Sequence, residues 1–442
     1  MIMNYYEMIC EKKCEKLAFV EDGIPYTYCE LVQMVDEAAM EISLNKDKMY
    51  GSMHNGTWRK MGEDVKTGKR VYMIKSRSFL EQLILFLACN KNDIIPMIVQ
   101  HDITEFPEIN EVPDEVCMAV MTSGTTGIPK ILYRTYESWC DFFPIQNEIF
   151  QINENSRMFV QGSLAFTGNL NLVMAQLYAG AVTIVENKFN PKRWEKVIKQ
   201  WDVDVIYLIP SKLMCIPDCF EEKNVNIKMI LSGSQSLGKK DAEMLKSVFP
   251  NTKVILYYGA SELNYISYVT DKDMNTKRNL IGKPFPKVDI SVKDGEIYVT
   301  NDFHVYGVKC PFSLKDKGYF DEDGNLYFEG RSDDIVGVRG RKVSKAKIEA
   351  AICEKDEVSE AAVVMGKDKD ILIAYVSVKD SIKDKIFTNE NRKAEFEQEI
   401  YVQIRKKLAH FEMPRRIVLI KEMPHNKDTG KIDRKNIAAF LM

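Results

Sequence analysis

Residues Met121 to Lys130 have the composition of a loop that binds phosphate. The segment reads M-T-S-G-T-T-G-I-P-K, so hydroxyl residues alternate with two glycines, and a lysine follows Pro129. Glycine lets backbone N–H groups approach oxygen atoms closely, hydroxyl groups donate hydrogen bonds without bulk, and lysine supplies positive charge. Apolar residues from Val116 to Met121 lead into the loop like a strand, which is not typical of a flexible surface turn. The chemistry that this segment predicts is the handling of a polyphosphate.

A Walker A loop is the closest alternative for such a segment. That loop requires the pattern G-x-x-x-x-G-K-[ST]. Here Lys130 does not follow a glycine, and Ile131 stands where the serine or threonine is needed. The phosphates are therefore expected to be held in another way.

The segments that would position this loop alternate between strands and helices. Residues Arg70 to Val99 read as a strand, a helix and a second strand, which is a βαβ unit with parallel pairing and a helix-covered sheet. Two further strand-and-helix passages follow, with strands at Val205 to Ile209 and Met229 to Leu231. Residues Leu280 to Tyr327 are rich in strands and turns, so we expect a small barrel-like lobe there. The expected fold class is α/β.

Length and charge exclude several classes of function. The chain has 442 residues, of which 45% are apolar, so it can bury a large core and is expected to form two or three subdomains. Its net charge of −3 provides no basic field, which argues against a nucleic-acid partner. No apolar run is long enough to span a membrane, and the N-terminus lacks the layout of a signal peptide. We expect a cytoplasmic protein with no membrane partner.

The cysteines do not form a recognisable framework. The ten cysteines are scattered without C-x-x-C spacing, so reduced thiols are expected. Two C-x-x-x-C pairs, Cys10 with Cys14 and Cys215 with Cys219, could each meet on a helix face. With five histidines in the chain and no second ligand pair nearby, a zinc site is not expected.

The glycine-rich segment resembles the phosphate-binding loop of the adenylate-forming (AMP-binding) superfamily. That family includes acyl-CoA synthetases, aryl-acid ligases, stand-alone adenylation domains of nonribosomal peptide synthesis and luciferases. Other segments similar to family motifs follow in the same order along nearly the whole chain. They are S-G-S-Q-S-L at Ser232 to Leu237, Y-G-A-S-E at Tyr258 to Glu262, G-R-S-D-D at Gly330 to Asp334 and T-G-K-I-D-R at Thr429 to Arg434.

This resemblance implies how the nucleotide is held. The loop residues expected to bind the phosphates are Thr122, Ser123, Gly124, Thr125, Thr126, Gly127 and Lys130. The turn expected to face adenine contains Gly233, Ser234 and Gln235. In Y-G-A-S-E, the resemblance implies that Tyr258 stacks on adenine next to Gly259, that Ser261 contacts the α-phosphate, and that Glu262 helps to hold magnesium. Serine replaces the usual threonine at position 261 and keeps the hydroxyl donor.

The same resemblance implies roles for residues in the C-terminal part of the chain. Asp316 and Arg331 are expected to contact the ribose, although Leu314 and Lys315 replace the usual Thr-Gly before Asp316. Asp333 is the expected hinge between an adenylation core at residues 1–332 and a small mobile α+β domain at residues 333–442.

Two residues of that mobile domain are expected to serve different steps. Lys431 resembles the catalytic lysine of the family. Gly340 lies in a segment that resembles the loop lining the approach of the thiol. A rotation about Asp333 would bring either one to the site.

The acid pocket differs from that of amino-acid-activating relatives. Those relatives have F-D-x-S, whose aspartate pairs with the α-ammonium group, whereas this chain has F-T-G-N with Thr167 in that place. A neutral hydroxyl cannot offset a desolvated ammonium group. Alternatively, Thr167 and Asn171 could simply cap a helix. The residues expected to line the pocket by resemblance are Thr167, Gly168, Asn171, Ile230, Ser232, Tyr257, Tyr265 and Ile266.

These observations together predict an AMP-forming ligase. ATP with Mg²⁺ would activate a small carboxylic acid, aryl or short acyl and lacking an α-amine, and the acyl group would pass to a thiol. The acceptor would be coenzyme A or the phosphopantetheine of a carrier protein supplied in trans. The alternatives are an amino-acid-activating domain that loads a separate carrier protein, a silent nucleotide sensor and a luciferase-type oxygenase.

Overall fold

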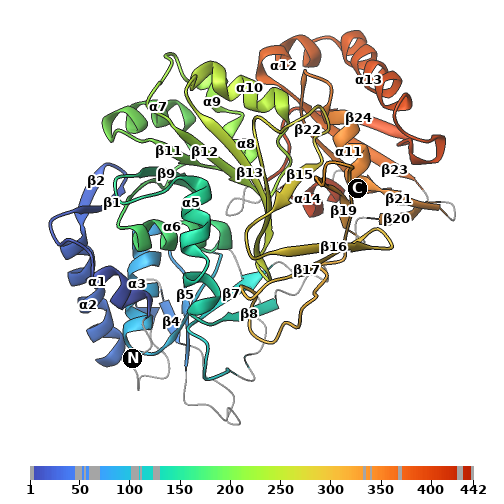
Figure 1. Cartoon of the computed structure of the whole chain (residues 1–442). Helices are drawn as coiled ribbons and strands as arrows, with labels where there is room; N and C mark the ends of the chain where they lie inside the picture. Colours follow the sequence, from blue (N-terminus) through green and yellow to red (C-terminus); the bar gives the residue numbers. More distant parts are fainter. Residues whose placement is uncertain are drawn as a thin grey trace. The chain divides into compact units, whose positions relative to one another are not determined.

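The computed structural model describes most of the chain, and the chain forms two compact units (Figure 1). The described residues are 4–44, 52–53, 56–58, 70–100, 109, 112–122, 130–331, 335–338, 341–366, 371–425 and 432–439. The first unit contains residues 1–273, 284–289 and 299–312, and the second contains residues 274–283, 290–298 and 313–442. The domain boundary that we expect after residue 332 is a hinge about which a domain would move, and it is not defined by packing. It stays a prediction.

The first unit is built on a largely parallel sheet. Its strands run in the order β14-β13-β12-β11-β9-β10-β1-β2, with parallel pairing from β13 to β1 and antiparallel pairing at both ends. Helices α5 and α6 lie on one side of this sheet and α7, α9 and α10 on the other (Figure 1). The strands are β1 (Leu17–Glu21), β2 (Ile24–Thr27), β9 (Arg157–Gln161), β10 (Val182–Glu186), β11 (Val205–Tyr207), β12 (Met229–Gly233), β13 (Lys253–Ala260) and β14 (Asn264–Thr270).

A second sheet of the same unit carries the glycine-rich loop. Its order is β3-β4-β5-β6-β7-β8, and the βαβ unit expected between Arg70 and Val99 is confirmed, because β5 and β6 pair in parallel across α3. The strands are β3 (Ser52–Met53), β4 (Gly56–Trp58), β5 (Val71–Ile74), β6 (Ile95–Ile98), β7 (Met118–Thr122) and β8 (Lys130–Arg134). The helices of the unit are α1 (Tyr5–Cys10), α2 (Tyr28–Leu44), α3 (Phe79–Lys91), α4 (Glu137–Cys140), α5 (Phe143–Phe150), α6 (Thr167–Ala179), α7 (Pro191–Gln200), α8 (Pro210–Leu213), α9 (Ile216–Cys219) and α10 (Lys239–Val248).

Local sequence explains several of these elements. Every residue of β10 is buried, as expected for a parallel strand covered on both faces. Helix α6 is buried over most of its length because it packs inside the unit. Helix α2 begins where Thr27 and Glu30 cap each other, the Thr27 N–H donating to the Glu30 carboxylate at 2.7 Å and the Glu30 N–H to the Thr27 hydroxyl at 3.2 Å.

The second unit combines a β lobe with an α+β domain. The lobe strands run in the order β15-β19-β18-β17-β16, and the domain has a β22-β23-β24 sheet and a β20-β21 hairpin. Its elements are β15 (Leu280–Pro284), β16 (Asp289–Lys293), β17 (Glu296–Thr300), β18 (Asp316–Phe320), β19 (Leu326–Arg331), β20 (Ile335–Val338), β21 (Arg341–Ser344), α11 (Lys345–Cys353), β22 (Val358–Met365), β23 (Leu372–Val378), α12 (Asp380–Phe387), α13 (Glu390–Arg405), the 3₁₀ helix η2 (His410–Glu412), β24 (Arg416–Ile420) and α14 (Arg434–Ala439).

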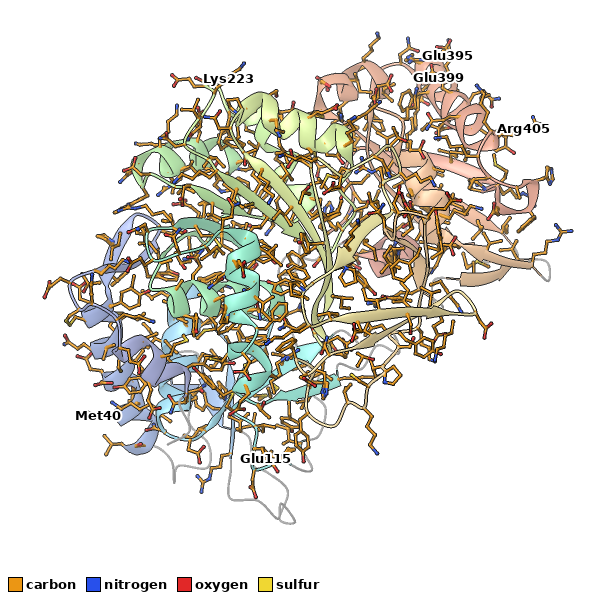
Figure 2. All side chains as sticks on the ribbon, viewed as in Figure 1. Met40, Glu115, Lys223, Glu395, Glu399 and Arg405 are labelled. Atoms are coloured by element: carbon orange, nitrogen blue, oxygen red, sulfur yellow. A yellow bond between two sulfur atoms is a disulfide. The ribbon has the colours of Figure 1, made fainter. Side chains whose placement is uncertain are left out.

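Charged side chains such as Lys223, Glu399 and Arg405 are exposed on the surfaces of the two units (Figure 2). Among the described residues, no helix is both long and apolar enough to cross a membrane.

One expectation about the cysteines was wrong. Cys14 and Cys29 form a disulfide, whereas reduced thiols were expected. The β1–β2 hairpin folds the chain back on itself, so the Cα atoms of these two residues lie 4.7 Å apart and the Cys29 N–H donates to the Cys14 carbonyl oxygen. This proximity depends on the hairpin pairing, and the cysteine spacing alone did not reveal it.

Lys212 is a half-buried lysine of the first unit. It lies in α8, just after β11, and its Nζ donates to the carbonyl oxygen of Gln161 at 3.2 Å. Burial disfavours the charged ammonium form and lowers the pKa of Lys212 to about 8. At pH 7 the amine is still charged in both the folded and the unfolded chain, so the folded state carries the cost of desolvating it.

We therefore expect Lys212→Met to raise the midpoint of thermal unfolding at pH 7, by the equivalent of about 1–3 kcal/mol. Because the folded pKa lies below the unfolded value, wild-type stability rises as the pH passes from about 8 towards about 10.5, and the difference between the two proteins should narrow in that window. Lys228→Met is the control, since the Lys228 side chain is 75% exposed. A lower midpoint for Lys212→Met than for wild type at pH 7 would contradict the assignment of a desolvation cost.

Candidate active site

The ends of the glycine-rich loop are held by strand pairing. β7 and β8 are antiparallel, and Thr122 stands opposite Lys130 in the register. The chain therefore enters and leaves the loop at paired positions, which places an exposed lysine at the exit. The predicted phosphate contacts Ser123, Gly124, Thr125, Thr126 and Gly127 lie outside the described residues.

The end of β13 and the turn that follows it carry the residues of the Y-G-A-S-E motif. Tyr258, Ser261 and Glu262 are half-buried, and Gly259 is exposed, so this segment reaches the surface of the unit. A Cβ atom at position 259 would lie 2.7 Å from the carbonyl oxygen of Asn264, which explains the glycine. Among the described residues, none forms a hydrogen bond or ion pair with the Glu262 carboxylate.

Helix α6 meets this turn and the start of β14 through two pairs of polar side chains. The Ser261 hydroxyl lies 3.2 Å from the Thr167 hydroxyl, and the Asn171 Nδ2 lies 3.5 Å from the Asn264 Oδ1. Thr167 and Asn171 are one helical turn apart, so they share a face of α6. The remaining amide atoms, Asn171 Oδ1 and Asn264 Nδ2, are buried without a hydrogen-bond partner. Sequence reasoning missed Asn264, for which the motif gave no signal.

Three buried tyrosines, among them the predicted pocket residues Tyr257 and Tyr265, pack against one another. The hydroxyl groups of Tyr207 and Tyr257 lie 2.7 Å apart, and the Tyr265 ring packs edge-on against Tyr257 with centroids 4.5 Å apart. Burial raises the pKa of Tyr257 to about 12 and raises those of Tyr207 and Tyr265 well above the ordinary value, so all three hydroxyls stay protonated at neutral pH. Tyr207 was not predicted as a pocket residue.

Two predicted site glycines provide the space for these rings. A Cβ atom at Gly168 would lie 2.6 Å from the Tyr207 hydroxyl and 3.1 Å from the Tyr257 hydroxyl. One at Gly233 would lie 2.4 Å from the Tyr257 ring, and Gly233 is the register partner of Tyr257 on β12. The Tyr257 side chain therefore lies across Gly233 and reaches the first turn of α6.

The other predicted residues of this region lie in the sheet or in the turn after β12. Ile230, Ser232 and Ile266 are fully buried, and the Ser232 hydroxyl donates to the Leu208 carbonyl oxygen at 2.7 Å. Ser234 is exposed and has a positive φ of 69°. The Gln235 side-chain oxygen accepts from the Ser211 N–H at 2.9 Å and so holds the predicted adenine turn against α8.

The predicted ribose contacts lie in the second unit. Asp316 on β18 and Arg331 on β19 are register partners, and the Arg331 Nε lies 3.2 Å from the Asp316 Oδ1. The Asp316 side chain is almost fully buried, whereas that of Arg331 is half exposed. The structure thus joins these two residues in an ion pair that their separation in the sequence did not suggest. Asp333, Gly340 and Lys431 lie outside the described residues.

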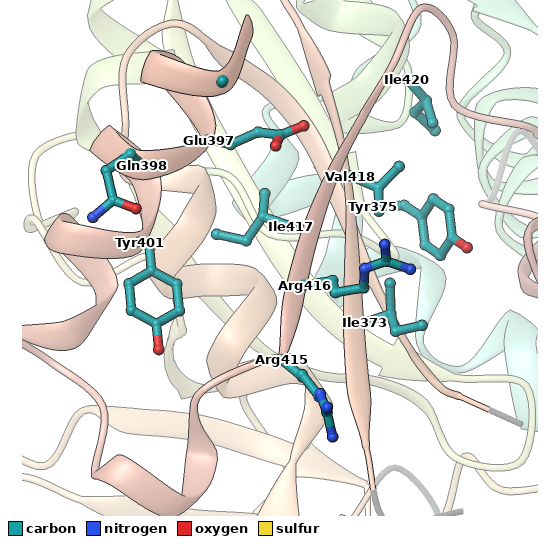
Figure 3. Close-up of a pocket in the computed structure, with 11 residues that line it drawn as sticks. Ile373, Tyr375, Glu397, Gln398, Tyr401, Arg415, Arg416, Ile417, Val418 and Ile420 are labelled. Carbon is teal, nitrogen blue, oxygen red and sulfur yellow. The ribbon is translucent and has the colours of Figure 1, made fainter. Parts of the chain in front are cut away.

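A groove of about 750 Å³ in the second unit contains none of the predicted site residues. Strands β23 and β24 and helix α13 form it, and Tyr375, Arg416 and Tyr401 are among the residues that line it (Figure 3). The predicted site residues therefore lie outside this groove.

The relatives found by comparison with known proteins agree with the family resemblance of the sequence. The chain is 25% identical over 340 residues to an uncharacterized acyl-CoA ligase, YhfT, of Bacillus subtilis, with 72% of this chain and 67% of that protein covered. It is 26% identical over 345 residues to 3,4-dihydroxybenzoate–[aryl-carrier protein] ligase of Bacillus anthracis, with 76% of each covered. Its fold is similar to that of ATP-bound MatB from Rhodopseudomonas palustris, with a TM-score of 0.78 at 18% identity, covering 100% of this chain and 99% of the other.

Two family domains match the chain in the order expected. The AMP-binding enzyme domain matches residues 59–302, and the AMP-binding enzyme C-terminal domain matches residues 347–431. The first match alone spans more than half of the 442 residues. The chain therefore belongs to the AMP-binding enzyme family.

Proposed function

We propose that this protein uses ATP to activate a small carboxylic acid that lacks an α-amine, and then transfers the acyl group to a thiol. The observation that carries this proposal is the 3.2 Å contact between the hydroxyls of Ser261 and Thr167. Ser261 is the proposed contact of the α-phosphate, and Thr167 opens the helix proposed to hold the acid. The acid and the α-phosphate of ATP would therefore meet at the contact between these two hydroxyl groups.

The chemistry brings an anion to a polyanion, so neutralisation of charge is the main requirement. The carboxylate attacks the α-phosphorus, and negative charge builds up on the departing pyrophosphate. The donors of the glycine-rich loop and Lys130 would hold the pyrophosphate, and Lys431 would bridge the carboxylate and the α-phosphate. No general base is required, because the acid is already ionised at neutral pH.

Glu262 fits a role in holding magnesium. Its half-buried carboxylate has no hydrogen-bond or ion-pair partner among the described residues, and a carboxylate oxygen is a ligand that Mg²⁺ prefers. When bound, the ion would neutralise phosphate oxygens as charge develops. The backbone of Glu262 is held from outside the turn, since its carbonyl oxygen accepts from the Val305 N–H at 2.9 Å.

The acceptor is proposed to be coenzyme A or the phosphopantetheine of a carrier protein. Relatives with names of both kinds support a thiol acceptor, since one is called an acyl-CoA ligase and another an aryl-carrier protein ligase. The roles of Asp333 as a hinge and Gly340 in the approach of the thiol belong to the same proposal.

Tyr257→Ala should admit longer acids. Its ring lies across Gly233 and fills the inner end of the proposed pocket, so its removal opens space beside β12. We expect the catalytic efficiency for acids extended by three to four carbons to rise about tenfold relative to the shortest acid that is activated, measured by ATP–pyrophosphate exchange. Tyr257→Phe, which keeps the ring, is the control and should retain the wild-type length preference. An unchanged preference in Tyr257→Ala would show that this ring does not limit the pocket.

Acids without an α-amine should be the better substrates. Thr167 offers no negative charge to a desolvated ammonium group, whose burial without a partner costs several kcal/mol. Matched pairs such as propanoate with alanine, and 3-phenylpropanoate with phenylalanine, can be compared by pyrophosphate exchange. If the amino acid has the higher catalytic efficiency in such pairs, the alternative of an amino-acid-activating domain is favoured instead.

Lys431→Ala should abolish adenylate formation and spare the second half-reaction. The substitution removes one contact to charge that develops in the transition state, and such losses slow a reaction by about 10²–10³-fold or more. Single-turnover measurements of adenylate formation, and of thioester formation from a supplied acyl-adenylate, separate the two steps. Equal losses in both steps would refute the assigned role.

A further inference from the structure

Arg134 is a fully buried cation in β8, the strand that leaves the glycine-rich loop. It is 0% exposed and lies four residues after Lys130. Its Nη2 donates to the carbonyl oxygen of Ser261 at 2.7 Å, and its Nη1 donates to the carbonyl oxygen of Phe303 at 3.0 Å and to the Ser138 hydroxyl at 3.2 Å. Neither the sequence motifs nor the family resemblance assigned a role to this residue.

Such a residue is costly to bury. The hydrogen-bond acceptors of its guanidinium group are neutral, and no carboxylate among the described residues forms an ion pair with it. Desolvation lowers the pKa of Arg134 to about 10, although the nearby Tyr5 and Glu262 act in the opposite direction. An apolar side chain could fill the same volume without this cost. The position of its hydrogen bonds therefore points to a role beyond packing.

The contacts of Arg134 fix the turn that carries Ser261 and Glu262. Three successive carbonyl groups of this turn are held from outside it: Ser261 by Arg134, Glu262 by the Val305 N–H at 2.9 Å, and Leu263 by the Asn301 Nδ2 at 3.0 Å. Arg134 also binds Phe303, which lies between Asn301 and Val305 in the chain. The Arg134 guanidinium group thus connects β8, the turn and the segment of residues 301–305 that also binds the turn.

We propose that Arg134 is a positioning residue of the nucleotide site: it ties the Ser261–Glu262 turn to β8, the strand that begins at Lys130, so that Lys130 and the turn together engage the phosphate chain of a nucleoside triphosphate with its divalent cation. The inference rests on the proposed function, because it takes Lys130 and the turn as parts of one nucleotide site. Its physical basis is that a displacement of about 1 Å at reacting groups can cost about 10²-fold in rate.

The test compares Arg134→Met and Arg134→Lys with Ser138→Ala. Ser138→Ala is the matched control, since it removes another hydrogen-bond partner of the same guanidinium group without touching the turn. For each folded variant, the affinity for Mg·ATP is measured by calorimetry, kcat and KM by pyrophosphate exchange, and stability by thermal unfolding.

We expect Arg134→Met to bind Mg·ATP at least tenfold more weakly and to lose about 10²-fold in kcat. Arg134→Lys keeps the charge but cannot reach both carbonyl oxygens in the same way, so it should recover part of each loss. Ser138→Ala should lower stability while leaving affinity and kcat at wild-type values. If Arg134→Met fails to fold, the comparison of Arg134→Lys with Ser138→Ala tests the proposal instead.

Two results would overturn the inference. One is wild-type affinity and kcat in the folded Arg134 variants. The other is a loss in Ser138→Ala as large as that in an Arg134 variant of equal stability, which would indicate a purely structural role. A failure of the proposed function can be distinguished from these two results. In that case the wild-type protein would bind Mg·ATP, but no carboxylic acid would support pyrophosphate exchange. The affinity measurements would still test the role of Arg134.

Discussion

The turn between β13 and β14 is the feature on which the candidate site depends. The parallel part of the first sheet ends at β13, and the chain reverses to form the antiparallel β14. The reversal exposes Ser261 and Glu262 at the edge where parallel strands of α/β sheets usually bind ligands. Three hydrogen bonds from distant parts of the chain hold the backbone of the turn. The backbone of the turn is thus held without the use of the Ser261 and Glu262 side chains.

Buried polar groups of the first unit carry some cost to stability. Arg134 and Lys212 are desolvated cations, and Asn171 and Asn264 each leave one amide atom without a partner. Groups of this kind lower the stability of a folded chain unless hydrogen bonds or opposite charges compensate. These groups lie near the motif residues of the first unit. Such costly polar groups are expected beside a binding site, because the site requires side chains that an apolar core would not contain.

In the proposed function, the choice of acid would depend on shape as well as charge. Thr167 lacks the negative charge that an α-ammonium group would need, and Tyr207 and Tyr257 fill the space beside Gly168. The two effects would act on different parts of the acid, because the first concerns the group next to the carboxylate and the second concerns the far end. A small acid without an α-amine would satisfy both conditions.

The sequence by itself determined the features that depend on short stretches of chain. The β5–α3–β6 unit follows from its apolar pattern, and the start of α2 follows from the mutual cap of Thr27 and Glu30. The ordered motifs indicated the family and hence the fold class, because the chemistry of phosphate binding requires particular residue types at close spacing. The sequence also drew attention to Thr167 as a departure from the pattern of amino-acid-activating relatives.

Only the tertiary structure decided which distant residues meet. Arg134 binds a carbonyl group 127 positions away, and Ser261 meets Thr167 across 94 positions. The Tyr207–Tyr257 contact, the Asp316–Arg331 ion pair and the Cys14–Cys29 disulfide likewise depend on strand register or on a hairpin. Local patterns encode propensity and periodicity, whereas these contacts follow from how the sheets pair and which side chains fill the space between them.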